Sequence, residues 1–198
     1  MDQLPSEPRF KAIAIGGSAG SIEALGPLLS ALPADLRASV LVVLHLPRNR
    51  PSLLCRIFQE RCALPLREAQ DKEPIAAGTV YFAPPDYHLL VDAGPALALS
   101  VDPPVHYSRP CIDVLFESAA DAYGKQLIGI VLSGANHDGA NGLAAIHANG
   151  GLSIVQDPAS APVSAMPGAA LQRTAASQVL PPQGIAALLV SLHAEGSL

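Results

Sequence analysis

The sequence contains no tryptophan, and aromatic residues make up only 4% of its 198 residues. Charged residues are also few, at 15%, whereas apolar residues account for 49%. This balance excludes an intrinsically disordered chain, because disorder requires low hydrophobicity together with high net charge. A chain of this length is expected to form one domain with a sizeable buried core.

Basic residues are scarce: 12 lysines and arginines stand against 17 aspartates and glutamates, which gives a formal net charge of −5. With no basic stripe, the sequence weighs against nucleic acid as a partner. No apolar run approaches the roughly 20 residues of a membrane span, and the first eight residues do not resemble a signal peptide. We therefore expect a soluble cytoplasmic protein that is not inserted in a membrane.

Cysteine is equally sparse, with Cys55, Cys62 and Cys111 forming no C-x-x-C pair and leaving one residue over. Reduced thiols with a structural role are the expected state of such a set. Neither the cysteines nor the six histidines show metal-ligand spacing. We accordingly expect no metal site and no cofactor.

Apolar runs of strand length alternate with segments of helical period after residue 10, which predicts a doubly wound α/β fold. Its sheet should be mainly parallel, with helices on both faces. Residues 1–10 are expected to be a short tail and residues 11–193 a single domain. Predicted strands span 12–15, 39–45, 79–83, 127–132, 152–156 and 178–180. Predicted helices span 22–32, 51–61, 110–123, a short segment ending at 150, 163–173 and 184–193. Segments 88–92 and 96–101 predict an antiparallel hairpin.

The corner between the first strand and the first helix reads Gly-Gly-Ser-Ala-Gly over residues 16–20, a G-x-S-x-G pattern. Flanking glycines permit a sharp turn that exposes the Ser18 hydroxyl at the strand's carboxyl end, where the helix aims free N–H groups. Ser18 could equally be a helix-capping residue. A nucleotide-binding turn fits poorly, since Ser18 and Ser21 replace the second and third glycines of the dinucleotide pattern and no Gly-Lys-Ser/Thr follows.

Two other predicted strand ends carry the residue types that a serine nucleophile requires. His45 closes the second strand, and Asp138 lies in the loop after strand 127–132, so all three side chains should reach one edge of the sheet. His137 is a rival base and Asp157 a rival carboxylate, although Asp157 precedes a proline and suits a turn. The chain order serine, histidine, aspartate differs from that of α/β-hydrolases, in which the acid precedes the histidine.

The same residues carry a resemblance to the catalytic domain of the chemotaxis receptor methylesterase, CheB, over about residues 11–193. Segment 15–25 (IGGSAGSIEAL) is similar to the family's nucleophile segment, 42–47 (VVLHLP) to its histidine segment and 130–142 (IVLSGANHDGANG) to its aspartate segment. Segments 81–90, 108–116 and 156–167 add further similarity. Three motifs in the right order and spacing make this a specific match.

The resemblance implies hydrolysis of glutamate γ-methyl esters on the cytoplasmic domains of methylated chemoreceptors, with release of methanol and often deamidation of receptor glutamines. It implies Ser18 as nucleophile, His45 as general base and then acid, and Asp138 as the carboxylate that orients His45. The backbone N–H groups of Ala19 and Ala135 would bind the oxyanion. Loss of one such donor typically lowers the rate about 100- to 1,000-fold.

Two features depart from the family pattern. Many members have Gly-Met-Gly where residues 134–136 read Gly-Ala-Asn, so that Ala135 stands at the methionine position. The ten residues before Lys11 are also too few for the phospho-receiver domain of the full-length regulators, so a standalone form is expected. The altered loop motivates an alternative, a non-catalytic receptor-binding or signalling module that keeps the fold. The sequence leaves the oligomeric state open.

Overall fold

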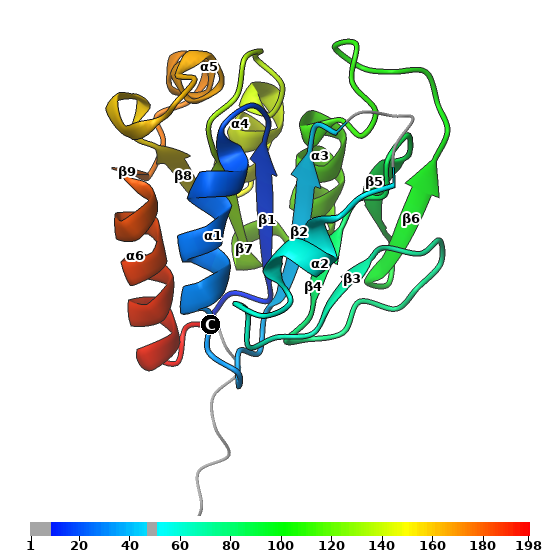
Figure 1. Cartoon of the computed structure of the whole chain (residues 1–198), viewed down its shortest axis with the longest axis vertical. Helices are drawn as coiled ribbons and strands as arrows, with labels where there is room; N and C mark the ends of the chain where they lie inside the picture. The colour runs from blue at the N-terminus through cyan, green and yellow to red at the C-terminus, as the bar shows by residue number, and fades with distance from the viewer. Residues whose placement is uncertain (1–8, 47–50) are drawn as a thin grey trace, which may run out of the picture.

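A seven-stranded parallel sheet forms the centre of the protein, in the order β3-β4-β2-β1-β7-β8-β9 (Figure 1). The computed structural model describes residues 9–46 and 51–198. The strands are β1 (Ala12–Gly17), β2 (Ser39–Leu44), β3 (Leu66–Glu68), β4 (Val80–Phe82), β7 (Leu127–Val131), β8 (Leu152–Gln156) and β9 (Gln178–Leu180). A separate antiparallel pair consists of β5 (His88–Asp92) and β6 (Ala96–Ser100).

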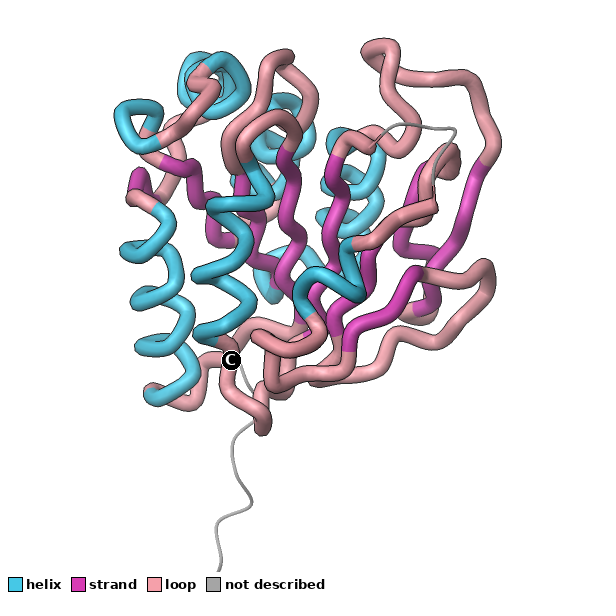
Figure 2. The backbone as a smooth tube through the Cα atoms, viewed as in Figure 1, coloured by secondary structure: helices cyan, strands magenta, loops and turns pink. Residues whose placement is uncertain are grey.

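Helices cover both faces of the sheet, as Figure 2 shows. One face packs against α1 (Ser21–Ala31), α2 (Leu54–Phe58) and α6 (Pro182–Ala194). The other packs against α3 (Ile112–Tyr123), α4 (Ala140–Ala148), α5 (Ala165–Arg173) and the β5–β6 hairpin. Short 3-10 turns lie at Gly124–Gln126 and Pro158–Ser160. The predicted doubly wound fold and its hairpin are confirmed.

Alternation along β1 divides the core into two layers. Ile13 and Ile15 point into the layer that contains α1 and α6, whereas Ala12 and Ala14 point into the layer that contains α3 and α4. All six residues of β1 are buried, as expected for a central parallel strand that is covered on both faces. Phe10, which the sequence places in the expected tail, is buried in the first layer, and its N–H donates to the Ser197 carbonyl over 2.8 Å.

Most predicted elements agree with the structure to within two residues at each end, and two elements differ by more. Helix α2 spans only Leu54–Phe58 instead of 51–61, and the hydroxyl of Ser52 accepts a hydrogen bond from the Leu54 N–H just before it. Strand β3 was not predicted, because its three residues are partly or fully exposed and show no apolar alternation. Its strand conformation comes from pairing with β4, a contact that no local pattern encodes.

The chain connections place a topological switch point at the carboxyl ends of the central strands. Strand β1 leads into α1 on one face, whereas its neighbour β7 leads towards α4 on the other face. In parallel α/β sheets, ligands bind at such a switch point. The loops after β1, β2 and β7 therefore define the edge where a site is expected.

Candidate active site

The Gly16–Gly20 corner turns sharply where β1 meets α1. Gly20 has a φ of +77°, and a Cβ atom there would lie 2.8 Å from the Pro162 Cβ. A Cβ on Gly17 would lie 2.6 Å from the Cβ of Ser21. The N–H and the hydroxyl of Ser21 both donate to the Ser18 carbonyl, which closes the turn. Glycine is thus required on both sides of Ser18, as the pattern predicts.

Strand pairing brings His45 beside Ser18. Gly17 pairs with Leu44 in the β1–β2 register, and the His45 N–H donates to the Gly17 carbonyl over 3.2 Å. The predicted strand 39–45 therefore ends one residue early, and His45 is the first residue beyond β2. Within the described residues, no hydrogen bond joins the Ser18 and His45 side chains. Catalytic hydrogen bonds are often long until substrate binds.

Asp138 lies behind the His45 ring, on the side that faces the protein interior. The Asp138 Oδ2 accepts a hydrogen bond from His45 Nε2 over 2.8 Å, and the Asp138 side chain is completely buried. Because Nε2 is bound to the carboxylate, Nδ1 is the ring nitrogen that remains to accept a proton. The predicted pairing of these two residues, which are 93 positions apart, is thus present.

The first turn of α3 holds the Asp138 carboxylate. The N–H groups of Ile112 and Asp113 donate to it over 2.7 and 2.9 Å, and the Cys111 thiol donates over 3.0 Å. These groups belong to a helix N-terminus, whose free N–H donors and positive dipole end stabilise an anion. Sequence analysis did not assign Cys111 this role; its position at the start of a predicted helix was the available signal.

Burial and hydrogen bonding act in opposite directions on the Asp138 carboxyl. Burial alone would raise its pKa, but the hydrogen bonds from His45, Ile112, Asp113 and Cys111 outweigh burial and lower the pKa below the usual value of 3.8. Burial, together with the neighbouring Asp138, raises the pKa of the Cys111 thiol. The thiol therefore stays protonated and donates its hydrogen, while Asp138 stays ionised beside His45.

Ser133 connects the loops that carry Ala19 and Ala135, although sequence analysis did not select it. The fully buried Ser133 hydroxyl donates to the Ala19 carbonyl over 2.7 Å, and its carbonyl accepts from the Ser18 N–H over 2.9 Å. The N–H groups of Ala19 and Ala135 donate no hydrogen bond within the described part of the chain. Both amides therefore keep an open donor at the carboxyl edge.

The rival residues have other contacts. His137 Nε2 lies 3.2 Å from His106 Nδ1 and makes no hydrogen bond to Asp138. Asp157 accepts from the Ala159 N–H over 3.0 Å, so it caps the short turn after β8, as its proline neighbour indicates. Neither residue pairs with Ser18 or His45, which leaves Ser18, His45 and Asp138 as the set brought together.

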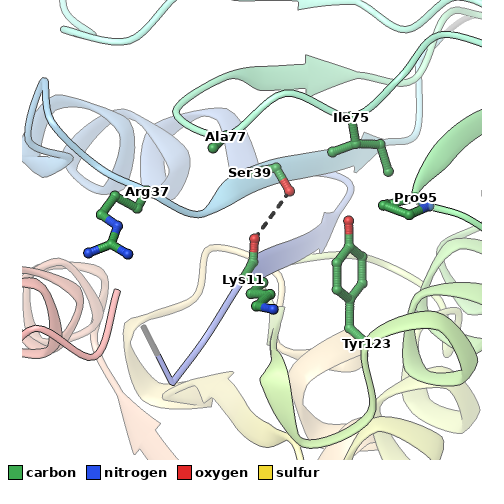
Figure 3. A pocket seen from close by; sticks show the side chains of 7 residues that line it. All are labelled: Lys11, Arg37, Ser39, Ile75, Ala77, Pro95 and Tyr123. Atoms are coloured by element: carbon green, nitrogen blue, oxygen red, sulfur yellow. Dashed lines mark hydrogen bonds between the residues drawn. The ribbon is translucent and has the colours of Figure 1, made fainter. Parts of the chain in front are cut away.

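Cavities at the two edges of the sheet differ in size and chemistry. A cavity of about 370 Å³ lies at the amino ends of β1 and β2, and its lining is drawn in Figure 3: Lys11, Arg37, Ser39, Ile75, Ala77, Pro95 and Tyr123. This lining includes no carboxylate and no histidine. A hollow of about 80 Å³ lies beside His45, between Leu46 and residues 107–110. Only the smaller hollow adjoins a histidine–carboxylate pair.

Residues 9–46 and 51–198 contain no group of three or more histidine, cysteine, aspartate or glutamate side chains placed to hold a metal ion. No helix in the described part of the chain has both the length and the apolar character that a membrane span requires.

A doubly wound α/β sheet with serine, histidine and a buried aspartate at its carboxyl edge is typical of serine hydrolases. The family model of CheB methylesterase matches residues 13–189. The chain therefore belongs to the CheB methylesterase family, as the sequence motifs predict.

Individual relatives agree with this assignment. A Leptospira interrogans protein, provisionally named protein-glutamate methylesterase/protein-glutamine glutaminase, is 42% identical over 92% of this chain and 95% of its own length. A Symbiobacterium thermophilum protein with the same name is 40% identical over 98% of this chain, which spans only 53% of that relative. The crystal structure of the Thermotoga maritima CheB methylesterase catalytic domain superposes with a TM-score of 0.88 at 30% identity. The superposition covers 92% of this chain and 98% of the Thermotoga maritima chain.

Proposed function

We propose that residues 11–193 form one catalytic domain that hydrolyses γ-methyl esters of protein glutamate residues, with Ser18, His45 and Asp138 as its catalytic residues. The observation that carries the proposal is the 2.8 Å bond between His45 and a buried, ionised Asp138, directly beside Ser18 in the β1–β2 register. The relatives' names supply the reaction class.

The geometry supports a two-step acyl transfer. Ser18 Oγ attacks the ester carbonyl carbon while His45 Nδ1 accepts its proton, and Asp138 stabilises the resulting imidazolium. The N–H groups of Ala19 and Ala135 bind the oxyanion. Collapse expels methanol, which takes the proton from His45. Water then attacks the acyl-enzyme with His45 again as base, which releases glutamate and restores Ser18. Deamidation of glutamine follows the same path with ammonia as the leaving group.

The proposed substrate is the cytoplasmic domain of a methylated chemoreceptor, which places the protein in the cytoplasm. A protein substrate suits the small hollow of about 80 Å³ beside His45, because only one modified side chain has to enter it. The remainder of such a substrate would lie across the surface around the site.

The alternative is a non-catalytic module that keeps this fold and binds receptors. It is motivated by Ala135, which replaces the methionine of many family members. The backbone N–H of residue 135 survives any change of side chain, and this amide is the group the mechanism needs. The open amides of Ala19 and Ala135 therefore favour catalysis over the alternative.

Methanol release from a methylated receptor fragment tests the proposal, with wild type compared with Ser18→Ala. Loss of a triad serine lowers turnover about a millionfold, so the variant should show only background release. A fluorophosphonate probe should add one label to the wild type and none to Ser18→Ala. If the wild type stays unlabelled and releases no methanol, the non-catalytic module is the better description.

A further inference from the structure

A long connection between β6 and α3, residues 101–111, extends past the carboxyl edge of the sheet (Figure 1). We call it the strap. Its tip is a tight turn in which Val105 and Ser108 exchange backbone hydrogen bonds of 3.1 and 2.9 Å. His106, directly after Val105, has a φ of 48°, a left-handed conformation that glycine and asparagine adopt more readily than other residues. The imidazole of His106 therefore projects from a strained, closed turn.

The loop that follows β7 is held at both of its ends. Gly134 bonds through its N–H to the Val163 carbonyl over 3.0 Å and through its carbonyl to the Met166 N–H over 2.9 Å. Four residues later, the first turn of α3 holds the buried Asp138 carboxylate. The residues between these ends carry the proposed oxyanion donor, the Ala135 N–H, and are exposed or half-buried. The position of that amide therefore depends on what holds the middle of the loop.

One side-chain contact joins the middle of this loop to the strap. His137 Nε2 lies 3.2 Å from His106 Nδ1, and the two rings meet edge to face with their centroids 4.5 Å apart. We call these residues the histidine pair. Among the described residues, only His106 forms a hydrogen bond with residues 135–137 from outside the loop and the start of α4. The histidine pair therefore links the segment around the Ala135 amide to a second part of the chain.

His106 is itself anchored in α3. Its Nε2 lies 3.4 Å from the Asp113 Oδ2, and the Asp113 side chain is only 5% exposed. The other carboxylate oxygen accepts from the Gly142 N–H over 2.7 Å, and the Asp113 N–H donates to Asp138 over 2.9 Å. The Asp113 carboxylate attracts a proton on His106 Nε2, which leaves Nδ1 to accept from His137. The histidine pair thus connects the loop to the same helix turn that holds the catalytic carboxylate.

We propose that His106 is a positioning residue for the ester hydrolysis. It holds His137 and thereby keeps the Ala135 N–H in place to bind the oxyanion. The inference rests on the proposed function and deepens it, because it assigns a residue of the strap to the oxyanion site. An oxyanion donor stabilises the transition state more than the bound ester. Displacement of the Ala135 amide therefore lowers kcat and leaves KM nearly unchanged.

Two substitutions separate the side chain of His106 from its backbone. His106→Gly removes the imidazole and accepts the φ of 48° without strain, whereas His106→Asn also suits this φ and keeps a polar atom near the place of Nδ1. For His106→Gly, kcat for methanol release from a methylated receptor fragment should fall about tenfold, with KM within about twofold. His106→Asn should stay within about threefold of the wild-type kcat. The same pattern is expected with p-nitrophenyl acetate, since its hydrolysis also passes through an oxyanion.

His137→Ala tests the histidine pair from the side of the loop. This variant should also lose about tenfold in kcat. The double variant His106→Gly/His137→Ala should lose about tenfold and not about a hundredfold, because both changes break one contact. His193→Ala is the matched control, since His193 Nε2 lies 3.2 Å from a carboxylate oxygen of Asp35 and His193 belongs to α6; it should keep the wild-type kcat. Titration with a fluorophosphonate probe refers every kcat to the amount of active protein.

A kcat of His106→Gly within twofold of wild type overturns the inference, as does a rise in KM alone. A loss that His106→Asn does not restore also overturns it, because the contact with His137 would then not be the one that matters. Losses that multiply in the double variant have the same consequence, since the two histidines would act independently. Failure of the proposed function is different: wild type itself would release no methanol from the receptor fragment, and the inference would fall with it.

Discussion

The two edges of the parallel sheet contrast sharply. The amino edge holds the larger cavity, about 370 Å³, lined by basic, hydroxyl and apolar side chains. The carboxyl edge holds hollows of about 80 Å³ beside His45, about 210 Å³ beside Gly20 and about 260 Å³ beside His137, and it assembles a serine, a histidine and a buried carboxylate. Cavity size therefore does not locate the chemistry of this protein.

Helix direction explains the difference between the edges. Helix α3 begins beside Asp138, with free N–H groups that bind the carboxylate, and it ends at Tyr123 beside the amino-edge cavity. The N-terminal end of a helix favours negative charge, whereas its C-terminal end does not. A buried, ionised aspartate is thus stabilised at the carboxyl edge and has no comparable support at the other.

The largest effect is expected from Asp138→Asn. An asparagine side chain has only one acceptor oxygen, so it cannot accept hydrogen bonds from both His45 and all the α3 N–H groups as the carboxylate does. The imidazole therefore loses its orientation and the stabilisation of its charged form. We expect kcat for methanol release to fall about 10,000-fold. Circular dichroism should confirm that the variant is folded. Tyr123→Phe, at the amino edge, serves as the control and should keep wild-type kcat. A loss of less than tenfold in Asp138→Asn would contradict the triad.

Two buried serines, one near each edge, allow the effect of losing a hydrogen bond beside the site to be compared with that of losing a purely structural one. Ser133→Ala removes the hydroxyl that bonds Ala19, and Ser153→Ala removes one that bonds His147 and Ser177 over 3.1 Å each. Both variants should lose about 1–3 kcal/mol of unfolding free energy in urea titrations. Only Ser133→Ala should also lower kcat, about ten- to a hundredfold, through displacement of the Ala19 amide.

Equal kcat values in the two serine variants would show that the Ala19 carbonyl contact does not position the oxyanion site. Equal loss of stability is the internal control, because both hydroxyls are fully buried and hydrogen-bonded.

The pKa of Asp138 predicts a smaller, pH-dependent effect on stability. Its folded-state pKa lies below the ordinary 3.8, so ionised Asp138 stabilises the folded state fully above about pH 3.8. That contribution should disappear as the pH falls from there through the lower folded-state pKa. The difference in unfolding free energy between wild type and Asp138→Asn, measured by urea titration at several pH values, should shrink over this range. A difference that grows on acidification would contradict the direction of the shift.

The smallest effect is expected at the amino-edge cavity. Arg37→Ala removes an exposed cationic side chain from its lining, just before β2 and at the edge of the sheet opposite Ser18. Surface substitutions of this kind usually change stability by no more than about 0.5 kcal/mol. We expect kcat and KM for methanol release to stay within about twofold of wild type. A larger change would mean that the two edges are coupled.

Several features of the site could be predicted because they are local. The glycines around Ser18 specify a turn, and apolar runs that end at His45 and before Asp138 predict strand ends. Parallel strands place their carboxyl ends at one edge, so three separate motifs converge there without any knowledge of their contacts. Strand β3 was missed for the opposite reason, since only its pairing with β4 makes it a strand.

The sequence by itself determined the α/β architecture, the family and the residues at the carboxyl edge, because these follow from short-range periodicity and from motifs of a few residues. Only the tertiary structure decided that α3 donates to Asp138, that Ser133 joins the two loops with open amides and that residues 107–110 line the hollow beside His45. Each of these contacts joins segments far apart in the chain. They depend on how the helices and loops pack against the sheet, and no local pattern records that packing.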